Sequence, residues 1–222
     1  MNDALPIIVA NLKANKTWNE MISWLTIVGP KVETFAGTVI ICPSYPFLAA
    51  CAQKIKETGW PIKLGSQDIS RFEQGAYTGE VAASQIAGIC QYSIIGHSER
   101  RQNFDEGEIV INKKVENVQK VGIEPIYCIQ SADNPVPPKV GIVAYEPIFA
   151  IGTGNPDSPE NVQKQARAVK TKGSFTVIYG GSVAPENVQS FITKDLVDGV
   201  LVGATNSLDP AKFTQILETA HY

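Results

Sequence analysis

The chain has 222 residues, of which 44% are hydrophobic and 18% are charged, and this composition is typical of a globular protein with one substantial core. A net charge of −3 and an isoelectric point near 5.5 argue against a general binder of nucleic acid or membrane surfaces. Four cysteines without a CxxC pair indicate reduced thiols in the cytoplasm, and two histidines offer little for a metal site. The N-terminus resembles neither a secretory signal nor a membrane span.

Short apolar runs rich in β-branched residues recur along the chain. Several are continuously apolar, which is typical of parallel strands covered on both faces. The runs are 6–12, 38–43, 61–68, 92–99, 124–130, 140–147, 175–181 and 199–204.

Helical patterns lie between these runs. Apolar residues spaced three and four apart predict amphipathic helices within 111–118, 188–192 and 213–220. Proline suits the first turn of a helix, so the proline-containing segments predict helix starts. These segments are 158–160, 184–186 and 209–210.

Eight strands in this length allow about 28 residues per unit, which suits a strand and its helix. The alternation predicts a parallel sheet, and eight units predict a closed (β/α)8 barrel. No proline- or serine-rich linker divides the chain, so we expect a single domain over residues 1–222. An open doubly wound sheet is the alternative; it is disfavoured because neither GxGxxG nor GxxxxGK[ST] occurs.

One connection departs from the pattern. After 124–130 the chain runs through SADNPVPP (131–138) directly into the next strand, although a parallel crossover normally needs a dozen or more residues. Three prolines oppose a helix there and favour extended polyproline geometry. We expect eight strands with only seven crossover helices. The outer barrel surface near the fifth and sixth strands should then be uncovered, or capped by a partner subunit.

Active sites of such barrels lie at the C-terminal ends of the strands. The first strand leads into Asn11 and Lys13, the fourth into His97, and the sixth into Glu146. Three later segments are rich in glycine, and their backbone amides could hold a phosphate group. These segments are 152–154, 179–182 and 201–204.

Each of these side chains also has an ordinary interpretation, as a surface lysine, a structural histidine or an acid paired with an arginine. His97, however, precedes Ser98 and Glu99, which mark a helix start, and a helix N-terminus disfavours imidazolium. Glu146 has apolar neighbours, which suit a proton-accepting carboxylate. Together they predict proton abstraction next to a carbonyl on a small phosphorylated substrate.

The same residues also allow two other reactions. YGGSVAP (179–185) lacks the last glycine of the GxSxG nucleophile motif because Ala184 occupies that position, which disfavours a serine hydrolase. Lys13 could instead form a Schiff base, as in barrel aldolases, and borohydride would then trap substrate on it.

Six motifs, in order over essentially the whole chain, resemble the triosephosphate isomerase family. They are NLKANK (11–16), GAYTGEV (75–81), IIGHSERR (94–101), AYEPIFAIGTG (144–154), YGGSV (179–183) and LVGATNSLDPAKF (201–213). The resemblance implies a TIM barrel that interconverts dihydroxyacetone phosphate and D-glyceraldehyde 3-phosphate in glycolysis and gluconeogenesis. It implies no cofactor and no metal.

The resemblance also implies a role for each residue at the strand ends. Glu146 would be the base that moves a proton between two carbons through an enediolate, and neutral His97 would polarise the carbonyl. Lys13, with Asn11 beside it, would stabilise the enediolate and attract the phosphate. Glu99 would position Lys13.

The phosphate would lie against backbone N–H groups of the glycine-rich segments, under a lid formed by 147–154. The residues concerned are Gly152, Ser182, Gly203 and Ala204. The loop 67–80 would carry Thr78 to a partner's active site in a homodimer or larger homo-oligomer. No nucleic-acid or membrane partner is expected.

The chain departs from the family pattern in three places. SADNPVPP replaces a helical insertion, with Ser131 where an acid is usual; Phe149 replaces the lid tryptophan; and Asn155-Pro156-Asp157 replaces a flexible hinge. A catalytically weak barrel that binds a phosphate ligand, with a binding or assembly role, is therefore the alternative function.

Overall fold

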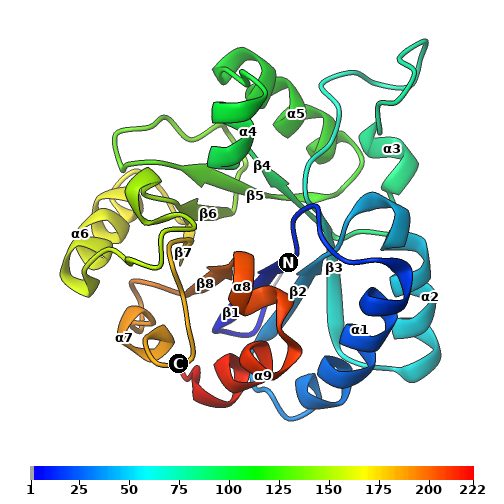
Figure 1. Ribbon diagram of the computed structural model, residues 1–222. Coiled ribbons are helices and arrows are strands. Elements are labelled where there is room, and N and C mark those ends of the chain that lie inside the picture. The colour runs from blue at the N-terminus through cyan, green and yellow to red at the C-terminus, as the bar shows by residue number, and fades with distance from the viewer. Residues whose placement is uncertain (1–2) are drawn as a thin grey trace.

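The computed structural model, which describes residues 3–222 apart from the side chain of Ala204, is a closed barrel of eight parallel strands. Each strand pairs with the next along the chain, and the eighth pairs with the first. This confirms the predicted (β/α)8 fold (Figure 1). The strands are β1 (Ile7–Asn11), β2 (Thr38–Cys42), β3 (Ile62–Ser66), β4 (Tyr92–Ile95), β5 (Glu124–Ile129), β6 (Ile142–Tyr145), β7 (Thr176–Tyr179) and β8 (Gly199–Val202).

Helices surround the barrel in Figure 1 and follow every strand except β5. They are α1 (Trp18–Val32), α2 (Leu48–Thr58), α3 (Ala83–Ile86), α4 (Ser98–Asn103), α5 (Glu108–Lys120), α6 (Pro159–Lys170), α7 (Val188–Phe191), α8 (Ala204–Leu208) and α9 (Pro210–Thr219), with short 3₁₀ turns at Tyr45–Phe47 (η1) and Ile148–Ala150 (η2). Within residues 3–222, none of the helices is long and apolar enough to cross a membrane.

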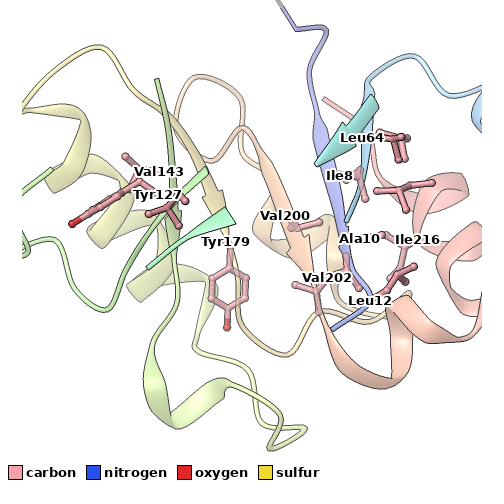
Figure 2. Packing of buried hydrophobic residues seen from close by; sticks show 14 of the residues in the cluster. Ile8, Ala10, Leu12, Leu64, Tyr127, Val143, Tyr179, Val200, Val202 and Ile216 are labelled. Atoms are coloured by element: carbon pink, nitrogen blue, oxygen red, sulfur yellow. The ribbon is translucent and has the colours of Figure 1, made fainter. Parts of the chain in front are cut away.

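The continuously apolar strands are explained by two apolar layers, one inside the barrel and one between barrel and helices. In β1, Ile7 and Val9 belong to the inner layer, while Ile8 and Ala10 belong to the outer one, and all four are at most 1% exposed. Figure 2 shows part of the outer layer, where Ala10 lies beside Ile216 of α9. Both faces of each strand therefore need apolar side chains.

Two of the three predicted helix starts are confirmed. Ser158 and Asp209 cap α6 and α9 with their side chains, and a proline follows each at the first helical position. The third prediction, at 184–186, is wrong: this segment is a loop and turn, and α7 begins only at Val188. The side chain of Asn187 accepts from Ala184 N and donates to the carbonyl of Ser182, which stabilises a turn in place of a first helical turn.

The connection between β5 and β6, residues 131–140, is called the strap below. It contains no helix, as the prolines predict. The expectation that the barrel surface beneath it is uncovered or needs a partner is wrong. Tyr127 and Val143, in the outer layer of β5 and β6, are fully buried, because Ala132, Val136 and Val140 of the strap pack into the same apolar cluster.

Hydrogen bonds fasten the strap to the helices on both sides of it. The amide of Ala132 donates to Gln165 Oε1 of α6 at 2.8 Å, and Lys172 Nζ donates to the carbonyl of Ala132. On the other side, Gln119 Nε2 of α5 donates to the carbonyl of Pro138 at 3.0 Å. The strap thus covers the space of a crossover helix with irregular chain that contains turns but no helix.

Candidate active site

The predicted site residues lie at the C-terminal mouth of the barrel, in the segments that follow β1, β4, β6, β7 and β8. A pocket of about 120 Å³ opens there. It is lined by Lys13, His97, Ile151, Gly152, Gly154, Gly180, Gly181, Ser182, Val183, Leu201, Gly203, Thr205 and Asn206. Five residues with polar side chains and five glycines therefore line one small cavity.

Lys13 is held in a left-handed backbone conformation, with φ of 52°. Its amide donates to Asn11 Oδ1 at 3.1 Å, and its carbonyl accepts from Ser44 Oγ at 2.9 Å and from Gln67 Nε2 at 2.8 Å. Lys13 Nζ pairs with Glu99 Oε1. Such a conformation is costly for a residue with a side chain, and here three hydrogen bonds and an ion pair maintain it.

His97 caps the N-terminus of α4 with its own imidazole ring. Nδ1 accepts from the amide of Glu99 at 3.1 Å, which leaves the ring proton on Nε2 in the neutral form. The ring is almost fully buried, and Nε2 lies 3.2 Å from Glu146 Oε1. The helix N-terminus thus sets the tautomer.

Glu146 is a buried carboxylate, 1% exposed, directly after β6. Its Oε2 accepts from the amide of Ser98 at 3.1 Å. Its Oε1 has no hydrogen-bond partner among the described residues, although His97 Nε2 lies 3.2 Å away. A Cβ atom on Gly180 would lie 2.8 Å from Glu146 Cγ, so the glycine makes room for this side chain.

Cys128 lies beside this carboxylate on β5. Burial, and then the charge of Glu146, raise the pKa of the Cys128 thiol well above its usual value. The thiol therefore stays neutral next to the acid, and adds no second negative charge to the site.

The lid segment 147–154 closes one side of the pocket. Ser182 Oγ donates to the carbonyl of Ala150 at 2.5 Å and accepts from the amide of Gly154 at 3.2 Å. Phe149, in contrast, is 61% exposed. Ser182 therefore connects the loop after β7 to both the first and the last part of the lid.

The structure brings most of the predicted residues together. Asn11, Lys13, Glu99, His97 and Glu146 form one continuous series of contacts, from β1 through α4 to β6. Gly152, Ser182 and Gly203 line the pocket, and Ala204 begins α8, with its side chain outside the described part. Thr78 is not brought to this site: it is exposed in the 67–80 loop, which extends away from the barrel in Figure 1.

Other residues of the site were not predicted as such. Ser98 lies within the IIGHSERR motif, and its backbone amide donates to Glu146. The identity of a side chain does not predict such a backbone contact. Nothing in the sequence singles out Gln67, because a glutamine after a strand is common. Its importance is visible only in the structure, where its side-chain amide donates to the carbonyls of Lys13 and Cys42. Thr205 and Asn206 line the pocket from α8.

A family model described as triosephosphate isomerase matches this chain over residues 6–135 and 134–220. The chain belongs to the triosephosphate isomerase family. The triosephosphate isomerase of Aquifex aeolicus is 33% identical over 95% of this chain and 98% of its own, and that of Symbiobacterium thermophilum is 34% identical over 97% and 96%. A solved triosephosphate isomerase from Bartonella henselae, 23% identical, shares the fold with a TM-score of 0.83 over 96% of this chain and 98% of that one.

The comparison with triosephosphate isomerases also bears on the strap. The family match divides at residues 134–135, inside the strap. The alignment with the Aquifex aeolicus relative spans 244 residues, more than the 222 of this chain, so the relative has residues that are absent here. The break in the family match, which falls inside the strap, supports a shortened connection between β5 and β6.

Proposed function

We propose that this chain interconverts dihydroxyacetone phosphate and D-glyceraldehyde 3-phosphate, with Glu146 as the base. The observation that carries the proposal is the state of Glu146. One of its oxygens is fixed by the Ser98 amide, and the other is buried beside the ring of His97, with no hydrogen-bond partner in residues 3–222. A base needs an oxygen that can accept a proton and is shielded from water.

The reaction proposed is a proton transfer between adjacent carbons. Glu146 breaks the C–H bond next to the carbonyl and takes the proton, and the electron pair moves to the carbonyl oxygen to give an enediolate. Nε2–H of His97 stabilises the developing oxyanion, and Lys13 adds positive charge near it. His97 passes the hydroxyl proton of one substrate oxygen to the other oxygen, and Glu146 returns its proton to the neighbouring carbon, so that no proton is gained or lost overall.

The substrate phosphate is proposed to lie in the glycine-lined pocket. Backbone N–H groups of Gly152, Ser182, Gly203 and Ala204 are the candidate donors, and Lys13 adds a cation at the same cavity. Lid closure over this pocket would exclude water and protect the enediolate. No step requires a metal or cofactor.

We test the proposal with Glu146→Gln in a coupled isomerase assay. Glutamine keeps the shape of the side chain but cannot act as a base, so we expect kcat to fall by about 10²–10⁴-fold with little change in KM. Glu57→Gln, an exposed carboxylate on α2, is the matched control and should keep wild-type rates. Near-normal turnover of Glu146→Gln would mean that another group is the base. A wild-type chain without isomerase activity would favour the phosphate-binding alternative.

The assembly is proposed to be a homodimer or larger homo-oligomer through the 67–80 loop. Residues 73–80 are all exposed, and Tyr77, 44% exposed, stacks on Phe72 with ring centroids 4.0 Å apart. Phe104, which is 63% exposed, lines the same cavity as Phe72 of this loop. Exposed aromatic side chains of this kind favour a protein interface.

The compartment is proposed to be the cytoplasm. All four cysteines lie in the described part of the chain, where they are free and buried. Burial raises the pKa of Cys51 to about 11 and that of Cys90 to about 12, so both remain unreactive thiols. Free thiols of this kind suit a reducing compartment.

A further inference from the structure

Asp157 is an acidic residue buried within an otherwise exposed segment. Residues 152–156 before it and Ser158 after it are exposed, whereas Asp157 is only 8% exposed. It stands between the lid and the first turn of α6. A charged side chain is buried at such a point only where specific hydrogen bonds offset the loss of water.

The hydrogen bonds of Asp157 use both its carboxylate and its backbone. Oδ2 accepts from Tyr145 Oη at 3.0 Å and from Asn161 Nδ2 at 2.7 Å, and Oδ1 accepts from the amide of Ser158 at 2.8 Å. The amide of Asp157 itself donates to Tyr179 Oη at 2.8 Å. The two carboxylate oxygens act only as acceptors here, and all three of their partners are donors.

The two tyrosines connect Asp157 to the strands that carry the candidate site. Tyr145 and Tyr179 are paired residues at the ends of β6 and β7, with ring centroids 6.2 Å apart. Tyr145 is followed by Glu146, and Tyr179 is followed by the glycines that line the pocket. A Cβ atom on Gly181 would lie 1.9 Å from Tyr179 Oη, so that glycine makes room for the hydroxyl that Asp157 contacts.

The hydroxyl groups remain protonated at working pH. Burial, followed by the hydrogen bond to Asp157, raises the pKa of Tyr145, and burial raises the pKa of Tyr179 to about 12. Tyr145 therefore remains a hydrogen-bond donor to Asp157 throughout the neutral range.

We propose that Asp157 is a positioning residue for the reaction, because it ties the trailing end of the lid to the strand ends that carry the base and the phosphate-binding glycines. The leading end is tied separately, since the amide of Glu146 donates to the carbonyl of Ile129 at 2.7 Å. With both ends fixed, the lid closes over the pocket in one defined position. The inference rests on the proposed isomerase function.

The test compares Asp157→Ala with Tyr145→Phe, the double variant, and Asn155→Ala as an exposed control in the same hinge. A misplaced lid weakens contacts made in the transition state, so Asp157→Ala should lower kcat/KM by about tenfold or more, mainly through kcat. It should also raise the fraction of turnovers in which the enediolate loses inorganic phosphate, which a merely less stable protein would not do. The double variant should be little worse than Asp157→Ala alone, because Tyr145→Phe removes a hydrogen bond that Asp157→Ala already removes.

Amide hydrogen exchange over residues 148–155 provides a measurement that does not depend on activity. Exchange should be faster in Asp157→Ala than in Asn155→Ala, without substrate. The proposal is overturned if the wild type is active and Asp157→Ala matches Asn155→Ala in kcat/KM and phosphate loss. An inactive wild type would contradict the isomerase function instead, and exchange would still show whether Asp157 ties the lid.

Discussion

Lys114 of α5 is a buried cation, 3% exposed, placed between two acids. Its Nζ lies 2.6 Å from Asp68 Oδ2 and 2.5 Å from Glu106 Oε1, and Arg100 contacts the same two carboxylates. Burial raises the pKa of Asp68 to about 6, even though Lys114 opposes that rise. Burial also disfavours the charge on Glu106, yet hydrogen bonds from Arg100 and Lys114 hold its pKa below the usual value.

Lys114→Met should therefore destabilise the fold. It leaves two buried acids short of a partner, and breaking a buried ion pair in this way costs about 3–5 kcal/mol in the free energy of unfolding. Lys113→Met is the matched control, because Lys113 is exposed and pairs with exposed Glu116, so we expect a change within about 0.5 kcal/mol. Urea unfolding at pH 7 measures both.

The loss in Lys114→Met should shrink as the pH falls from 7 toward 5. Buried acids without their cation have a higher pKa folded than unfolded, so the folded state binds more protons over this range and gains stability as the pH falls. The wild type gains less, since the pKa of its Glu106 is lowered. An equal loss at both pH values would contradict this account of the cluster.

At the scale of elements, the strap shows which structural features its prolines predict and which they do not. Three prolines in eight residues correctly exclude a helix between β5 and β6, because the reason is local to the chain. Whether a connection without a helix can cover the barrel surface depends on contacts with distant parts of the chain. Ala132 and Val140 pack in the same apolar cluster as Tyr127 and Val143, and hydrogen bonds join the strap to α5 and α6.

Gln165→Ala tests how much this fastening contributes. It removes the acceptor for the amide of Ala132, a buried residue, so the free energy of unfolding should fall by about 1–3 kcal/mol. Lys164→Ala, an exposed neighbour on α6, should be nearly neutral. Thermal and urea unfolding provide the comparison, and equal stability of the two variants would mean that apolar packing alone holds the strap.

At the scale of the whole molecule, the site is expected to be completed by a second copy. Thr78 is exposed and does not line the pocket of its own chain, so the expected role in an active site requires a partner. Thr78→Arg should shift sedimentation at micromolar concentration from an oligomer to a monomer, because a charge at the loop tip would be buried unpaired. Ile27→Arg, at an exposed position on α1, should leave the oligomer intact. A wild-type monomer with full activity at that concentration would refute the assembly.

The sequence by itself determined the barrel, its eight strands, the missing crossover and the groups at the strand ends, because these follow from local apolar patterns, proline chemistry and motif spacing. Only the tertiary structure decided that the strap covers the barrel, that Gln67 and the Ser98 amide support Lys13 and Glu146, and that Asp157 connects the lid to two tyrosines. These contacts join residues separated along the chain, and several use backbone groups that every residue has. Their partners are therefore set by the closure of the barrel rather than by the identity of any one residue.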